Sequence, residues 1–304
     1  LFLKMIKEEW NMNYMKRIKE IILFTIVCFM ITSCNSKTSD TIVDQSVTDK
    51  NASSETQASS TDEPQSRDVF AMDTYMTLTA YGDNAENALD KAEAEIERLD
   101  NLLSTGDGNS EIYALNQNGT GTISEDTEIL LDESEKLYTD TDGVFDITIY
   151  PVMDAWGFTT QNYRIPSEEE LKGLLENVNA SKIQYDKASK KVALPAGVKI
   201  DFGGIAKGYT SSRIMGIYKK CGVTSGMVSL GGNVQLLGAK PDGSFWRVAV
   251  QSPDDTNDYL GVLEAEDKAV ITSGGYERYF EENGKIYHHI IDPTTGYPAE
   301  NGLK

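Results

Sequence analysis

Two adjacent histidines near the C-terminal end carry the clearest chemistry in this 304-residue sequence, which contains no others. Asp292 follows the second histidine, His289, by three residues and opens an Asp-Pro-Thr-Thr-Gly segment. A histidine and a carboxylate held by such a turn suit a base that acts beside a metal-bound phosphate. Two structural alternatives stay open, because His289 could serve only structural hydrogen bonds and Asp292 could simply initiate the turn.

A glycine-rich segment supplies a second candidate site. Residues 201–209 are Asp-Phe-Gly-Gly-Ile-Ala-Lys-Gly-Tyr, which indicates a strand, a glycine turn and the start of a helix. The backbone N–H groups of such a turn, the helix dipole and Lys207 would attract an anion, although many turns of this kind bind nothing. Gly231 and Gly232 could act similarly, but a tight turn with positive φ explains them more simply. Trp156 and Phe158 could stack on a flat ring, although core packing is the usual role of such aromatics.

Several familiar site types are absent from the sequence. No GxGxxG motif follows a strand, and there is neither a Walker A motif nor a GxSxG elbow. A pair of adjacent histidines disfavours a zinc site built on His and Cys. Any metal would therefore be held mainly by oxygen, which indicates Mg²⁺ or Ca²⁺.

The charge balance excludes two classes of partner. The sequence has 28 Lys and Arg against 48 Asp and Glu, giving a net charge of −20. Nucleic-acid binding needs a basic surface, and so does electrostatic adhesion of the folded body to anionic lipid. An acidic protein that handles phosphates needs local help from a cation or from backbone N–H groups.

The N-terminal region resembles a bacterial lipoprotein signal. A basic stretch after Met15 precedes an apolar run at 21–31, and Ile-Thr-Ser-Cys then ends at Cys34. We expect residues 1–33 to be upstream sequence and signal peptide, and Cys34 to be lipidated. A plain signal peptide or a marginal membrane helix is the alternative. Lipidation would place the body on the extracytoplasmic face of the cell membrane, on the periplasmic side where an outer membrane exists.

The remaining chain divides into a tether and a folded body. Residues 34–67 are rich in Ser and Thr and lack aromatics, which predicts a flexible linker. For residues 68–304 the patterning predicts an α+β fold without regular βαβ alternation. Helices are expected at 85–103 after a capping Asp83, at 125–138, from the capping box at 167–170, and at 209–220. Strands are expected at 70–80, 191–194, 198–202, 226–230, 245–250 and 269–271.

From about Val69 to the last residue the chain resembles the ApbE family of FAD:protein FMN transferases. The resemblance combines the segments above, residues 143–158 and 272–298, with Met-x-Thr at 72–74 and Leu-Ser at 103–104 followed by Asn-Ser-Glu-Ile at 109–112. It implies a T-fold-related α+β fold of mixed sheets with packed helices. It also implies Mg²⁺-dependent transfer of FMN from FAD to a Thr or Ser hydroxyl of a target flavoprotein, with release of AMP. Targets in the family include Nqr and Rnf subunits and extracytoplasmic FMN-binding domains.

The same resemblance assigns roles to residues of this sequence. His289 would activate the acceptor hydroxyl, Asp292 would support its loop, and Ala206 would give its backbone carbonyl to the metal. The residues expected to line the FAD site are Met72, Phe145, Asp146, Gly203, Lys207, Tyr209 and Ile291.

Three departures from the family pattern bear on the site. Asp73 stands where members often carry Gly, and Gly106 stands where many carry a Tyr that packs on adenine, a role that Tyr113 could take instead. The sequence ends at Lys304, before the Asp and Thr side chains that members use as further metal ligands, and we expect it to be a fragment. A Mg²⁺-dependent FAD pyrophosphatase and a non-catalytic flavin-binding lipoprotein are the alternative functions.

Overall fold

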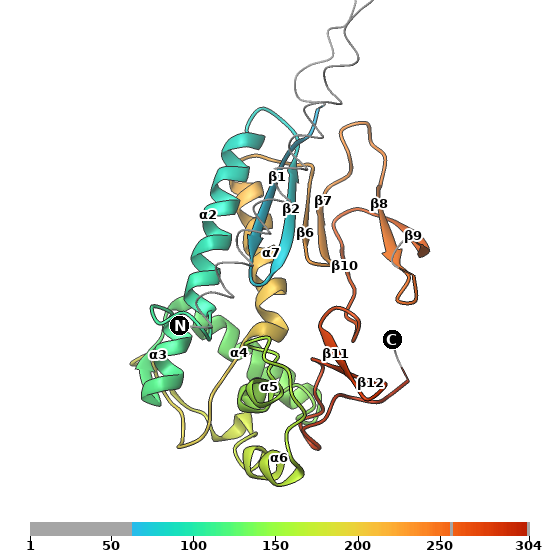
Figure 1. The fold of residues 1–304 in the computed structure, drawn as a ribbon. Coiled ribbons are helices and arrows are strands. Elements are labelled where there is room, and N and C mark those ends of the chain that lie inside the picture. Colours follow the sequence, from blue (N-terminus) through green and yellow to red (C-terminus); the bar gives the residue numbers. More distant parts are fainter. Residues whose placement is uncertain (1–62, 256–257, 303–304) are drawn as a thin grey trace, which may run out of the picture. The chain divides into compact units, whose positions relative to one another are not determined.

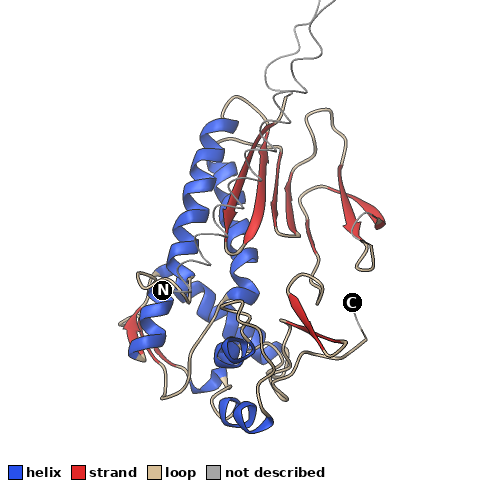
Figure 2. Ribbon diagram, viewed as in Figure 1, coloured by secondary structure: helices blue, strands red, loops and turns tan. Residues whose placement is uncertain are grey.

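The computed structural model describes residues 63–255 and 258–302 of the chain (Figure 1). The predicted signal peptide, Cys34 and most of the predicted tether lie outside these residues. Helices and strands alternate irregularly along the described part, so the α+β prediction is confirmed (Figure 2). Within it, no helix is long and apolar enough to cross a membrane.

A five-stranded antiparallel sheet forms the centre of the fold. In spatial order its strands are β1 (Gln65–Ala71), β2 (Thr74–Ala80), β6 (Gly226–Leu230), β7 (Asn233–Leu237) and β10 (Ala269–Ile271). Helices α2 (Ala85–Leu103) and α7 (Gly203–Lys220) pack on one face and bury Leu89, Ile96 and Tyr218 against it. On the other face, Trp246 of the hairpin β8 (Trp246–Gln251) and β9 (Tyr259–Ala265) packs against Leu236.

A second core lies between the N-terminal end of α7 and a small sheet. It is built by α3 (Glu111–Asn118), α4 (Glu125–Asp140) and the strands β3 (Thr120–Thr122), β5 (Lys191–Ala193) and β4 (Gln184–Asp186). Its fully buried side chains include Ile112, Leu130 and Phe202. Helix α7 contributes to both this core and the core under the main sheet, so its position is fixed from two sides.

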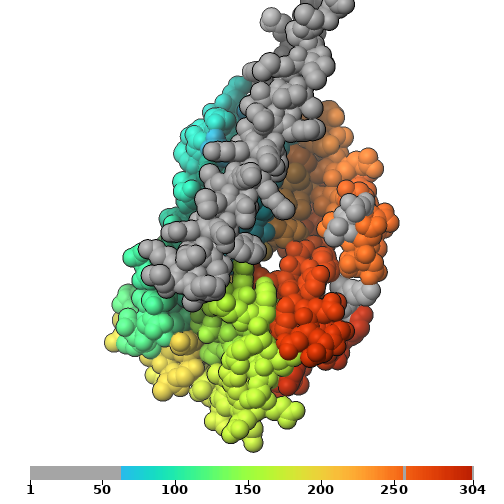
Figure 3. Space-filling view, viewed as in Figure 1, coloured from blue at the N-terminus to red at the C-terminus, as the bar shows by residue number. Residues whose placement is uncertain are grey.

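A third core joins the middle of the chain to the C-terminal segment. Its elements are η1 (Ile147–Ile149), α5 (Tyr150–Trp156), α6 (Glu168–Leu175), and the hairpin β11 (Tyr279–Glu282) and β12 (Lys285–His288); the short η2 (Ala180–Lys182) follows α6. The space-filling view shows the α5–α6 segment against the C-terminal segment (Figure 3). Trp156 and Phe158 are buried in this core, and Trp156 Nε1 donates to the Gly296 carbonyl at 2.7 Å. Core packing is therefore the role of both rings.

Helices α2, α4 and α6 follow their predicted patterns closely. Helix α2 has the predicted bounds, but Asn84 rather than Asp83 stands at its N-cap, without a side-chain hydrogen bond. Helix α4 runs two residues past its predicted end, and the Ser167 hydroxyl caps α6 at the Glu170 N–H, 3.1 Å away. This hydrogen bond confirms the start of α6 that the capping box predicted.

The first predicted strand is wrong in its bounds. The expected strand at 70–80 is a hairpin, because Met72 and Asp73 form a two-residue turn with φ of 49° and 57°. Positive φ at both central residues is the type I′ geometry that matches the twist of paired strands. Strand β1 begins at Gln65, so it includes three residues that the sequence assigns to the tether.

The predicted strand at 198–202 is not a strand. The Asn116 side chain takes the place of a neighbouring strand: its amide donates to the Ile200 carbonyl and its oxygen accepts from the Ile200 N–H, both at 2.8 Å. Helix α7 then begins at Gly203, six residues before its predicted start. Gly203 and Gly204 therefore lie in its first turn rather than in a loop before it.

We predict that Asn116→Ala destabilises the fold by about 2 to 5 kcal/mol, because it leaves a buried N–H and a buried carbonyl of Ile200 without partners. Urea unfolding followed by circular dichroism measures this loss. The neighbouring Gln117 is exposed, and Gln117→Ala is the matched control with an expected change within about 0.5 kcal/mol. Equal stability of the two variants would contradict the role assigned to Asn116.

Candidate functional site

Two hairpin turns meet at one end of the main sheet. The Met72–Asp73 turn joins β1 to β2, and Gly231–Gly232, with φ of 58° and 86°, joins β6 to β7. Strands β2 and β6 pair, so the turns are neighbours. A Cβ atom at Gly231 would lie 2.2 Å from Thr74 Oγ1. Gly231 is therefore required by close packing and positive φ, which supports the tight-turn explanation of this pair.

The first turns of α7 lie beside these hairpins. The Asp201 carboxylate accepts from the Gly203 N–H at 2.6 Å, and the Phe145 ring packs against Gly204, where a Cβ atom would be 2.9 Å from its Cε2. Gly203 and Gly204 are exposed, and Lys207 is partly buried one turn later. Met72 contacts the same helix through Thr210, whose hydroxyl lies 3.8 Å from Met72 Sδ. This arrangement places a solvent-exposed helix terminus, whose Gly203 N–H is already bonded to Asp201, beside a lysine.

Of the predicted metal site, the described residues contain only the backbone carbonyl of Ala206, and its contact with a metal stays a prediction. The Ala206 carbonyl accepts a hydrogen bond from Thr210 Oγ1 at 2.8 Å, in the interior of a regular helix. Among residues 63–255 and 258–302, no three His, Cys, Asp or Glu side chains are grouped to hold a metal ion. Because Mg²⁺ prefers carboxylate and other oxygen ligands, these residues do not fit a magnesium ion on their own.

His289 is held in one orientation by the backbone of Arg278. Its backbone N–H and its ring Nδ1 both lie 3.1 Å from the Arg278 carbonyl oxygen, and its ring meets the Phe158 ring edge-on at 6.5 Å. A carbonyl only accepts, so the Nδ1 carries the proton of the neutral imidazole. The Nε2 is then the basic nitrogen, as a general base requires. The neighbouring His288 lies on the other face of the hairpin, with its ring against Gly275.

Burial and mutual charge shift the ionisation of this cluster. Burial lowers the pKa of His289, and the nearby charges of Arg278 and Lys207 lower it further, against the hydrogen bond to the Arg278 carbonyl. Burial also lowers the pKa of Lys207, with Arg278 acting in the same direction and Glu277 and Asp73 opposing it. Burial raises the pKa of Asp201. His289 is therefore neutral at pH 7 and competent to accept a proton.

Asp292, Ile291 and Asp146 hold loops in place. Asp292 Oδ1 accepts from the Thr294 N–H at 2.8 Å and from its hydroxyl at 2.7 Å, while Ile291 bridges Pro298 and joins the third core. The buried Asp146 accepts from the N–H and hydroxyl of Thr148 and, at 3.1 Å, from the Ala180 N–H. Both oxygens of Asp146 are thus used inside the protein. Contact of these residues with a flavin stays a prediction.

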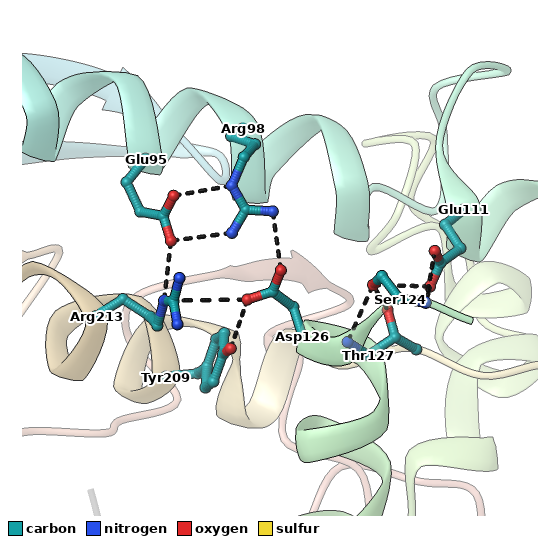
Figure 4. Close-up of polar contacts among 8 residues, drawn as sticks. All are labelled: Glu95, Arg98, Glu111, Ser124, Asp126, Thr127, Tyr209 and Arg213. Carbon is teal, nitrogen blue, oxygen red and sulfur yellow. Dashed lines mark hydrogen bonds and ion pairs between the residues drawn. The ribbon is translucent and has the colours of Figure 1, made fainter. Parts of the chain in front are cut away.

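Tyr209 points toward an ionic network between three helices (Figure 4). Its hydroxyl donates to Asp126 Oδ1 at 2.6 Å, and Asp126 also pairs with Arg98 at 2.9 Å. Glu95 binds both Arg98 and Arg213, at 2.8 and 2.9 Å. Tyr209 and Lys207 are roughly 200° apart around the helix axis, so the hydroxyl is directed away from Lys207. Its predicted contact with the flavin would have to use the ring.

Comparison with known proteins agrees with this geometry. The ApbE family model matches residues 72–304, which include both hairpin turns, the start of α7 and His289. The chain belongs to the ApbE family. The ApbE protein of Thermotoga maritima has a similar structure, with a TM-score of 0.75 and 32% identity over 78% of this chain and 79% of that one. The apo flavinyl transferase ApbE of Pseudomonas stutzeri gives a TM-score of 0.70 at 28% identity, over 79% and 77% of the two chains.

The curated relatives of this ApbE chain are FAD:protein FMN transferases. That of Klebsiella pneumoniae is 30% identical over 68% of this chain and 66% of its own length. That of Escherichia coli is 30% identical over 70% of this chain and 64% of its own length. The chain therefore spans slightly less than two thirds of these relatives.

Sequence reasoning missed Arg278, Asp201 and Tyr150. Arg278 directly precedes β11 and lies opposite His289, a relation that depends on hairpin register. Tyr150 is half-buried, and burial raises its pKa, with Asp201 and Tyr113 among the interacting groups. Tyr150 therefore lies within electrostatic range of Tyr113, the alternative adenine contact. The sequence signal that could have pointed to Arg278 is its position directly before β11.

A groove of about 460 Å³ lies at the other end of α7, beside Met215, Lys219 and Asp267. None of the residues predicted to bind flavin or to catalyse transfer lines it. Because reacting groups must touch the substrate, the hairpin turns and His289, rather than this groove, define the candidate site.

We predict that His289 titrates below its ordinary pKa of about 6.5. At such a pH the unfolded chain binds a proton at His289 and the folded chain does not. The free energy of unfolding therefore falls as pH drops from about 6.5 through the folded pKa. NMR titration of the histidine ring protons measures the value, with His289→Gln assigning the resonance. A pKa for His289 above 6.5 would contradict the burial and charge arrangement described.

Proposed function

We propose that the chain transfers FMN from FAD to a Ser or Thr hydroxyl of an acceptor flavoprotein and releases AMP. The observation that carries this proposal is the orientation of His289, with Nδ1 fixed on the Arg278 carbonyl and a basic Nε2 beside the charges of Lys207 and Arg278. The names of the curated relatives support the same reaction.

Substrate binding would use the exposed start of α7. Gly203 and Gly204 allow close approach to the helix N-terminus, where the helix dipole favours phosphate. The Gly203 N–H already donates to the Asp201 carboxylate, so phosphate would have to compete with Asp201 for it. Lys207 adds a positive charge one turn later on an otherwise acidic protein. These groups would hold the pyrophosphate of FAD, while Tyr113 and Tyr150 offer rings for a base.

The reaction exchanges the phosphoanhydride bond of FAD for a phosphoester bond to the acceptor. The acceptor hydroxyl oxygen forms a bond to the phosphorus of the FMN half, and the bond from that phosphorus to the bridging oxygen breaks. The hydroxyl proton passes to His289 Nε2, and the bridging oxygen leaves with AMP. Lys207 would stabilise charge on the phosphate oxygens during transfer. Dependence on Mg²⁺ stays a prediction, and no step here passes through a metal.

Hydrolysis of FAD to FMN and AMP is the second candidate. The same basic Nε2 could take a proton from water instead of from an acceptor hydroxyl. Mass spectrometry of a co-expressed acceptor flavoprotein separates the two reactions. A gain of one FMN supports transfer, whereas free FMN with an unmodified acceptor supports hydrolysis.

We predict that His289→Ala lowers the transfer rate by about 10² to 10⁴, with FAD affinity changed only a few-fold, because a general base acts on the rate more than on binding. His288→Ala is the matched control, since its ring lies on the opposite face, and we expect a milder loss. Single-turnover transfer to the acceptor measures both. Equal rates for His289→Ala and the unaltered protein would exclude His289 as the base.

We also propose that Cys34 anchors the protein to the extracytoplasmic face of the membrane, on the strength of the lipobox-like segment in the sequence. Lipidation of one residue ahead of a long polar linker leaves the folded body unchanged. We therefore predict that Cys34→Ser moves the protein from the membrane to the soluble fraction and preserves FAD binding. Continued fractionation with membranes would contradict the anchor.

A further inference from the structure

Arg278 and His289 form one register pair of the β11–β12 hairpin. Tyr279 pairs with His288 in the ladder, and the next pair is joined by the His289 N–H and the Arg278 carbonyl at 3.1 Å. Directly opposed residues of an antiparallel pair project from the same face, with their Cβ atoms about 5 Å apart. The guanidinium of Arg278 is therefore carried on the same face as the imidazole of His289.

This face brings two cations together. Arg278 lies close enough to Lys207 to lower its pKa, although Lys207 is already partly buried. Two positive charges in a partly buried site destabilise each other unless an anion lies between them. The opposing carboxylates that interact with Lys207 are those of Glu277 and Asp73. The pair of cations suits a ligand with more than one negative charge, such as a pyrophosphate.

Asp73 is a weakly bound counter-ion for Arg278. Its Oδ2 lies 3.6 Å from Arg278 Nη2, and its side chain is 75% exposed. This distance exceeds the roughly 2.7 to 2.9 Å of a strong charge-assisted hydrogen bond, and exposed pairs of this kind contribute little. Asp73 also holds a φ of 57°, which glycine would adopt with less strain. A phosphate oxygen could therefore displace it readily.

We propose that Arg278 is a phosphate-contacting residue of the flavin site, and that Asp73 is an internal counter-ion which the substrate pyrophosphate displaces. This inference rests on the proposed function and adds to it a residue that binds the negatively charged phosphate oxygens. A planar guanidinium can bind two phosphate oxygens at once, which Lys207 cannot. Asp73 would lower affinity for FAD by competing for the same guanidinium.

Binding of FAD and of riboflavin to the full chain tests the role of Arg278. Riboflavin has the same ring system but no phosphate, so it reports on the fold and the ring site alone. We expect Arg278→Gln to weaken FAD binding roughly 10- to 100-fold and riboflavin binding by less than about twofold. Arg278→Lys should lie between Arg278→Gln and the unaltered protein for FAD. Equal weakening for both ligands would overturn the assignment.

Asp73→Asn tests the counter-ion. We expect it to tighten FAD binding by about two- to fivefold, to leave riboflavin binding unchanged, and to have no effect in the Arg278→Gln background. Asp68→Asn is the matched control, because it removes the same charge from an exposed position of the same hairpin. An effect of Asp73→Asn that equals that of Asp68→Asn, or a loss of FAD affinity, would overturn the counter-ion role.

The same measurements separate this inference from the proposed function. If the unaltered chain bound neither FAD nor riboflavin, the proposed function would be contradicted first. If it bound both and transferred FMN while Arg278→Lys and Arg278→Gln kept full FAD affinity, only the role of Arg278 would be overturned. Thermal unfolding of each variant identifies those that fail to fold, and Asp73→Asn, at an exposed turn, then decides the outcome.

Discussion

Helix α7 belongs to two hydrophobic cores at once, and the site depends on this double burial. Ile214, Met215 and Tyr218 lie under the main sheet, whereas Ala206 near its first turn joins the second core. Burial of a large apolar side chain stabilises a fold by about 1.5 to 3 kcal/mol, so the helix cannot shift along its axis without loss in both cores. Lys207 and the exposed glycines thus keep a fixed place beside the hairpin turns.

The ionic network of Figure 4 fixes the orientation of α7, which packing alone holds in position. The carboxylates of Glu95 and Asp126 are only 12% and 14% exposed, and both are paired with arginines. A carboxylate this buried is stable only with its partners in place. Because the network joins α2, α4 and α7, it fixes the rotation of α7 about its own axis. That rotation decides which residues face the hairpins and which face Asp126.

Much of the fold could be predicted from the sequence, because its helices have strong amphipathic patterns and caps. The α+β class, α2, α4 and the start of α6 followed from such local signals. The turn at Met72 and Asp73 did not, since Met72 is not a usual turn former and the hydrophobic alternation continues through it. The backbone at Ile200 could not be predicted either, because its partner is the side chain of Asn116, 84 positions away. Site residues that motifs identify, such as His289 and Lys207, lie near each other in the structure. Arg278 could not be identified in this way, because its place opposite His289 depends on the register of the hairpin.

The β11–β12 hairpin places the base and the arginine on one face through a single register. Its two-residue turn at Asn283 and Gly284, with φ of 54° and 77°, sets that register. A one-residue deletion within β12 would move His289 to the position of His288, on the opposite face, and bring Ile290 into the place of His289, since side chains alternate. The hairpin therefore tolerates substitutions at its exposed positions much better than insertions or deletions. During divergence of the sequence, the length of the β11–β12 hairpin is therefore constrained more tightly than its amino-acid composition.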